Sequence, residues 1–127
     1  MKKIILTTSI LLVLSTYFNV SIARGTASSS VVASIGFGPY YDNYCNSTSC
    51  VFVAVDPPPT QVQGDCANYS TGWHFVIDTS NDTGKQSLSA LLTAHSTGRR
   101  ISIEGSGYCK TANSGKTEDL YFLILKK

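Results

Sequence analysis

The sequence predicts a small α+β domain that is mainly β, built as a Greek-key barrel of about five strands with one α-helix. Two observations support this class. Short segments rich in β-branched and aromatic residues recur along the chain and are separated by Gly, Pro, Asn and Ser. One later segment changes from strand-like to helix-like spacing of its apolar residues. A chain of 127 residues fits one domain of this kind.

The start of the chain has the pattern of a secretory leader. A short basic stretch precedes Ile4 to Val13, which is apolar except for Thr7, Thr8 and Ser9. Ser21 and Ala23 place small residues where a signal peptidase requires them for cleavage after Ala23. The apolar run is shorter than the roughly 20 residues that a transmembrane helix needs. We therefore expect residues 1–23 to be a signal peptide, and residues 24–127 to form one secreted or periplasmic domain without a membrane span.

The charge of the chain does not suggest a nucleic-acid-binding protein. Ten basic and eight acidic residues give a formal net charge of +2. Removal of the leader also removes Lys2 and Lys3, which brings the exported part close to neutrality. The pairs Arg99-Arg100 and Lys126-Lys127 do not form the clustered basic patch that binds a phosphate backbone. We expect no nucleic-acid partner.

The four cysteines indicate disulfides. An even number in a small exported domain is typical of paired cysteines, and four allow three pairings. We favour Cys45–Cys50, which closes a short loop, together with Cys66–Cys109, which closes a long loop and restricts the unfolded chain more strongly. A zinc site is the alternative, but the sequence has no CxxC pair and both histidines lie far from the cysteines. We predict no metal and no cofactor.

The strands are expected in five segments. These are Val31 to Phe37, Cys50 to Val55, Gly72 to Asp78, Arg100 to Glu104 and Asp119 to Lys126. Residues 24–30 are small and polar, and we expect them to be loose. Residues 57–59 are three prolines without backbone donors, which end the second strand. Trp73, Phe75 and Ile77 alternate along the third strand and are expected to share one face.

One helix is predicted over about residues 84–97. Its expected buried face is formed by residues three, four and seven positions after the first. These residues are Leu88, Leu91, Leu92 and His95. Thr83 and Gln86 have the spacing of a capping box at the start. Gly98 can adopt the left-handed conformation that ends a helix.

The closing segment is unusually apolar. Leu120 to Leu125 carries apolar side chains on both faces, and Gly105 to Gly107 ahead of it permits a bend or bulge. The helix and the barrel interior are one way to cover both faces of such a strand. Packing in a ring of copies is the other, and both remain open because a small domain buries little surface by itself.

The segment Leu88 to Glu104 has a leucine-rich helix that ends in Thr-Gly before basic residues and a short strand. It resembles the B subunits of pentameric bacterial toxins of the subtilase-cytotoxin and typhoid-toxin group. The aromatic strand before the helix, the apolar closing strand and Ser29-Ser30-Val31-Val32 are similar to that family too. The resemblance implies an OB-like barrel that assembles as a homopentameric ring, binds sialylated or related glycans and delivers a separate A subunit.

Five residues are candidates for binding a sugar. Ser29 and Ser30 are candidates through the resemblance, and the alternative for them is a flexible polar terminus. Tyr40, Tyr41 and Tyr44 are candidates by their chemistry, because aromatic rings pack against sugar C–H surfaces. Their alternative is packing over the barrel end with the hydroxyls in water.

The expected function is therefore glycan binding by an exported protein that is not an enzyme. One alternative is an exported structural, adhesion or inhibitory protein without a glycan ligand. A lesser one is a ribonuclease-like hydrolase that uses His74, Glu104 and either Arg99 or Arg100. No spacing brings such an acid and base to a common scissile group, and no nucleophile motif or phosphate loop is present.

Overall fold

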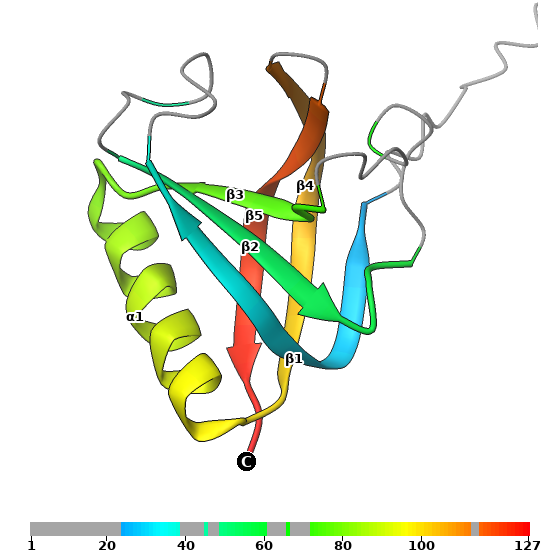
Figure 1. Cartoon of the computed structure of the whole chain (residues 1–127), viewed down its shortest axis with the longest axis vertical. Coiled ribbons are helices and arrows are strands. Elements are labelled where there is room, and N and C mark those ends of the chain that lie inside the picture. Colours follow the sequence, from blue (N-terminus) through cyan, green and yellow to red (C-terminus); the bar gives the residue numbers. More distant parts are fainter. Residues whose placement is uncertain (1–23, 39–44, 46–48, 61–65, 67–71, 113–114) are drawn as a thin grey trace, which may run out of the picture.

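The computed structural model describes residues 24–38, 45, 49–60, 66, 72–112 and 115–127. Its elements, in chain order, are β1 (Thr26–Phe37), β2 (Cys50–Asp56), β3 (Phe75–Asp78), α1 (Asp82–Thr97), β4 (Ile101–Ala112) and β5 (Gly115–Leu125) (Figure 1). The predicted class, mainly β with one helix, is confirmed. The expected leader lies outside the described residues.

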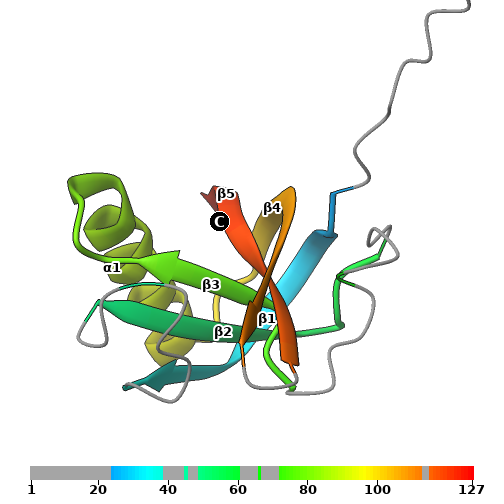
Figure 2. The same ribbon diagram turned by 90° about the horizontal axis from the view of Figure 1, so that it is seen from above.

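The five strands form one cyclic sheet. Their order is β1-β2-β3-β5-β4, and β4 pairs back to β1. The β3–β5 pairing is parallel and the other four are antiparallel. The helix connects β3 to β4 and packs mainly against β1. This is the five-stranded Greek-key arrangement of an OB-like barrel. Figure 2 shows α1 on one side of the barrel, away from the start of β1.

The barrel core is apolar and receives side chains from all five strands and the helix. Val53, Phe75, Leu91 and Ile101 are fully buried at its centre. A second, smaller cluster forms around Phe52 on the other face of the sheet. Burial of this apolar surface is the main stabilising contribution to the fold.

Trp73 does not share a face with Phe75 and Ile77, so this prediction was wrong. The tryptophan is half-buried against the smaller cluster, and its ring centroid lies 6.1 Å from that of Phe52. Phe75 and Ile77 face the main core. The reason is that β3 begins only at Phe75, so the strand alternation does not extend back to Trp73.

The first strand begins earlier than predicted, and the residues expected to be loose are ordered. Thr26 pairs with Glu104 and Ala27 pairs with Ile103, so the first part of β1 is held by β4. The second part of β1 pairs with β2, after a register shift next to Ser29. The segment lacks the β-branched and aromatic run that marks a strand, and it is ordered by backbone pairing with the neighbouring β4.

The helix ends as predicted and begins two residues earlier. Gly98 is left-handed, with φ of 67°. The N-cap is Asn81 and not Thr83, because the Asn81 side chain accepts a hydrogen bond from the Gly84 N–H at 2.8 Å. A Cβ on Gly84 would lie 1.9 Å from the carbonyl oxygen of Asp78, so the first turn packs directly on the end of β3.

Both predicted disulfides are present. Cys45 pairs with Cys50 and Cys66 pairs with Cys109, with sequence separations of 5 and 43. The longer bridge ties the β2–β3 connection to β4. The bend expected at Gly105 to Gly107 is a pair of register shifts within a longer β4, which continues to Ala112.

Candidate functional site

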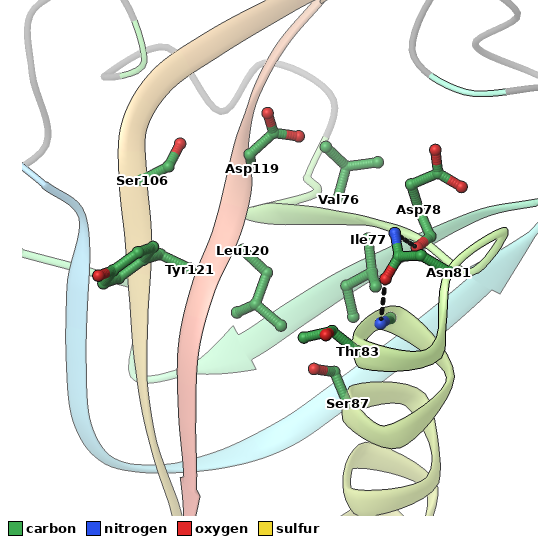
Figure 3. A pocket seen from close by; sticks show the side chains of 11 residues that line it. Val76, Ile77, Asp78, Asn81, Thr83, Ser87, Ser106, Asp119, Leu120 and Tyr121 are labelled. Carbon is green, nitrogen blue, oxygen red and sulfur yellow. Dashed lines mark hydrogen bonds between the residues drawn. The ribbon is translucent and has the colours of Figure 1, made fainter.

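The barrel opens where β3 and β5 separate. These strands pair only at Phe75 with Glu118 and at Val76 with Asp119. Beyond these two pairs the chain leaves β3 for the first turn of α1, while β5 continues beside β4. A cavity of about 330 Å³ lies in this gap. We call it the β3–β5 cleft (Figure 3).

The cleft combines polar side chains with an apolar floor. Its polar side chains include Asp78, Thr83, Ser87, Ser106, Asp119 and Tyr121. Val76, Ile77 and Leu120 supply apolar surface between them. Ligand pockets typically have this composition, in which an apolar lining carries a few polar groups that fix orientation.

The two carboxylates come from different elements. Asp78 closes β3, and its Oδ1 accepts the N–H of Ser80 at 2.9 Å. Asp119 lies on β5, and Ser106 stands on the neighbouring β4 (Figure 3). The cleft therefore presents several hydrogen-bond acceptors and hydroxyl groups from three strands and the helix.

Tyr121 is the aromatic residue of the cleft. Its side chain is 63% exposed. The Arg24 guanidinium lies 4.6 Å from the ring centroid and forms an ion pair with Glu104 at 3.1 Å. An exposed ring of this kind offers an apolar face with a hydroxyl at its edge.

A second cavity continues from the cleft along the helix. It has a volume of about 270 Å³ and lies between α1 and β5. Thr83, Ser87 and Tyr121 line both cavities. Phe122 and Ala90 add apolar surface to the second one.

The candidate serines lie on β1 and do not line the β3–β5 cleft. Ser30 is fully buried, and its hydroxyl donates to the carbonyl of Pro57 at 3.0 Å. Ser29 has φ of 64°, at the register shift of β1, and its carbonyl accepts a hydrogen bond from Arg100. The hydroxyl of Ser30 thus has a structural partner. Tyr40, Tyr41 and Tyr44 lie outside the described residues.

The residues of the hydrolase alternative contact four different partners. The Nδ1 of His74 accepts the Val55 N–H at 3.0 Å, and burial lowers the pKa of this histidine, so the ring is held neutral. Glu104 pairs with Arg24. Arg99 and Arg100 donate to the backbone carbonyls of Lys126 and Ser29, respectively.

The described residues contain neither a cluster of metal ligands nor a candidate membrane-spanning helix. No three of their His, Cys, Asp and Glu side chains lie close enough together to hold a metal ion. None of their helices is both long and apolar enough to cross a membrane.

Sequence reasoning missed Asp119 and Tyr121 as cleft residues because both belong to a segment dominated by apolar side chains. Their spacing of two residues was the available signal, since it places both on the same face of a strand. Their position beside the end of β3 depends on the parallel β3–β5 pairing, which sequence spacing does not reveal.

The comparisons identify no relatives. No protein-family model, no curated protein and no solved structure matches the chain.

Proposed function

We propose that this protein is an exported, non-catalytic glycan-binding protein that assembles as a ring. Three features support the proposal. Barrels with this strand order bind oligosaccharides and oligonucleotides in other proteins. Two disulfides fit an oxidising compartment. The charge of the chain argues against a nucleic-acid ligand.

The β3–β5 cleft carries the glycan proposal. Sugars present hydroxyl groups around an apolar C–H surface, so their sites combine hydrogen-bonding side chains with an aromatic ring. Asp78, Asp119 and Ser106 supply polar groups, and Tyr121 supplies the exposed ring. Each would act by positioning the sugar, and no proton transfer or bond cleavage is required.

Ring assembly is supported by apolar surface on α1 and β5. Leu92, Phe122 and Ile124 are each about half exposed, although all three belong to regular elements of the barrel. Exposed apolar side chains of this size can take part in a protein–protein interface.

A head-to-tail contact between two different surfaces closes into a ring when its rotation permits. We propose five copies, as the toxin B subunits form. Such a ring could carry a separate A subunit. The expected leader, with cleavage after Ala23, would place the protein outside the cytoplasm, either in the periplasm or in the medium.

The test begins with the oxidised protein purified after export. Its absolute mass by light scattering is expected to correspond to five protomers, and a glycan array is expected to show binding. A monomer at high micromolar concentration would exclude the ring. An array without any signal would exclude the glycan ligand and leave an exported structural, adhesion or inhibitory protein.

A pair of variants tests the interface directly. Leu92→Glu and Phe122→Glu are expected to lower the measured mass to that of a monomer, because each buries a charge in the proposed contact. Phe37→Glu is the matched control, since Phe37 is also exposed but lies on β1. An equal effect of all three substitutions would count against this interface.

A further inference from the structure

We infer that Arg24 is a positioning residue of the glycan site. Held by Glu104, its guanidinium fixes the ring of Tyr121 at the rim of the β3–β5 cleft and so prepares that ring to pack against a sugar. Arg24 does not itself line the cleft, so it acts through Tyr121. This inference deepens the proposed glycan-binding function and depends on it.

Three segments far apart in the sequence meet at this ring. Arg24 precedes β1, Glu104 lies on β4 and Tyr121 lies on β5. The guanidinium carbon of Arg24 lies over the Tyr121 ring, 4.6 Å from its centroid, and Nη1 donates to Oε1 of Glu104 at 3.1 Å. Figure 3 shows the Tyr121 side chain reaching from β5 across β4. The guanidinium therefore has a carboxylate at its edge and an aromatic ring beneath it.

The backbone next to Arg24 is also held in place. The N–H of Gly25 donates to both carboxylate oxygens of Glu118, at 3.0 and 3.2 Å. Thr26 then pairs with Glu104 in the ladder between β1 and β4. This stretch is therefore fixed against β4 and β5, the two strands that carry the partners of the guanidinium. Because Arg24 is only one residue from these anchors, its side chain starts from a defined position.

A guanidinium suits this place better than an ammonium group. It is planar, so it can lie over an aromatic ring while N–H groups at its edge donate to a carboxylate. A lysine ammonium is a compact charge and has no plane to stack on the ring. Because Arg24 is bound on two sides, it restricts rotation of the Tyr121 side chain.

A ring that is already fixed binds a sugar more tightly than a mobile one. Immobilising a side chain on binding costs free energy, and a preorganised side chain avoids most of that cost. Tyr121 is 63% exposed and lines both the β3–β5 cleft and the α1–β5 cavity, so ring surface remains for a ligand beside Arg24. Loss of Arg24 should therefore weaken glycan binding without removing a direct contact to the sugar.

The first measurement needs no glycan. Three-bond NMR couplings in the exported, oxidised protein report the χ1 rotamer of Tyr121. We expect a single rotamer in the wild type and averaged couplings in Arg24→Gln. Lys85→Gln is the matched control, because Lys85 also forms an ion pair, with Asp82 at 3.4 Å, but lies on α1. The same rotamer distribution in the wild type and Arg24→Gln would overturn the inference.

The second measurement is glycan affinity. The probe is the immobilised oligosaccharide array that tests the proposed function, and the oligosaccharide with the strongest signal is then titrated against each variant. Arg24→Gln is expected to weaken binding about three- to tenfold, and Arg24→Lys nearly as much. Lys85→Gln should leave the affinity unchanged. Wild-type affinity in Arg24→Gln, or full rescue by lysine, would overturn the inference.

A double-mutant cycle separates positioning from a general effect on the fold. Tyr121→Ala alone is expected to weaken binding about tenfold, which leaves the affinity measurable. In this background Arg24→Gln should cause no further loss, because the ring that Arg24 positions is absent. An equal loss in both backgrounds would show that Arg24 acts on the fold or on the sugar directly, and would overturn the inference.

The outcomes separate the two proposals. If no oligosaccharide on the array binds the wild type, the proposed function fails and this inference fails with it. If a glycan binds with an affinity that neither Arg24→Gln nor Arg24→Lys changes, the glycan function stands and the role assigned to Arg24 is wrong.

Discussion

The carboxylate of Glu118 accepts hydrogen bonds from the backbone N–H of Gly25, at 3.0 and 3.2 Å to its two oxygens. The N–H of Gly107 donates to the same carboxylate at 2.6 Å. Glu118 is fully buried, so these donors replace the water that the carboxylate loses on folding. The contact joins the residues just before β1 to β4 and β5 at one end of the barrel.

Glu118→Gln is expected to lower the free energy of unfolding by about 1–3 kcal/mol, because one acceptor oxygen becomes an amide NH₂ that faces backbone donors. Urea denaturation measures the change. Glu104→Gln is the control, since that glutamate forms a partly exposed ion pair and its loss should cost less than about 1 kcal/mol. A larger loss of unfolding free energy for Glu104→Gln than for Glu118→Gln would contradict the stabilising role of the Glu118 hydrogen bonds.

The stability of the protein should depend on the protonation of Glu118. Burial raises the pKa of this carboxyl, although the Gly107 and Gly25 donors and the charge of Arg24 lower it, and Asp119 adds to the increase. The folded state therefore keeps a proton at pH values where the unfolded chain, with a pKa near 4.5, has lost it. The contribution to stability is fully present below pH 4.5 and is lost as pH rises through the raised pKa.

This dependence is measured as the difference between the wild type and Glu118→Gln across pH. His74 also makes the stability depend on pH, with the opposite sign. Taking the difference removes this contribution, because His74 is the same in both proteins. The wild type should lose stability relative to the variant as pH increases through the carboxyl range. The opposite slope would mean that the backbone donors lower the pKa of Glu118 by more than burial raises it.

Gly105→Ala should destabilise the barrel by about 1–3 kcal/mol or more, because the new Cβ would lie 2.1 Å from Cδ of Glu118. The clash is with a side chain, so it should diminish when that side chain is shortened. In a double-mutant cycle with Glu118→Ala, the double variant is therefore expected to lose less unfolding free energy than the sum of the losses in the two single variants. Additive losses would place the strain in the β4 backbone instead.

The two disulfides should contribute unequally to stability. Replacing Cys66 and Cys109 by serine removes a cross-link with a sequence separation of 43, which costs about 4 kcal/mol in the chain-entropy model. Replacing Cys45 and Cys50, separated by 5, should cost about 2 kcal/mol. Urea denaturation of the two double variants compares them. A larger loss of stability for the Cys45 and Cys50 variant would show that strain or denatured-state structure, and not loop length, determines the contribution of each disulfide.

The sequence predicted the elements whose signals are local. The helix and its end at Gly98 follow from apolar spacing and a left-handed glycine, and the β2 strand follows from a β-branched run that prolines terminate. The disulfide pairing was also predicted, although only by preference among three arrangements. Periodicity over a few residues is sufficient for such elements because it determines which side chains share a face, and the helix also forms its hydrogen bonds within the segment.

The start of β1 and the face of Trp73 were predicted wrongly because both depend on distant partners. Thr26 is ordered by pairing with Glu104, and no local pattern in the small polar residues before Val31 indicates this. Trp73 precedes the regular part of β3, where alternation no longer determines direction.

By itself, then, the sequence determined the mainly-β class, the single helix and part of its buried face, since Leu91 is buried as expected whereas Leu92 is 45% exposed. Only the tertiary structure decided that Glu118 is buried against Gly25 and that Asp78 and Asp119 line the same cleft. The physical reason is that these relationships depend on the parallel pairing of β3 with β5 and on the closure of β4 onto β1. Both pairings join segments far apart in the chain, and local side-chain spacing contains no information about them.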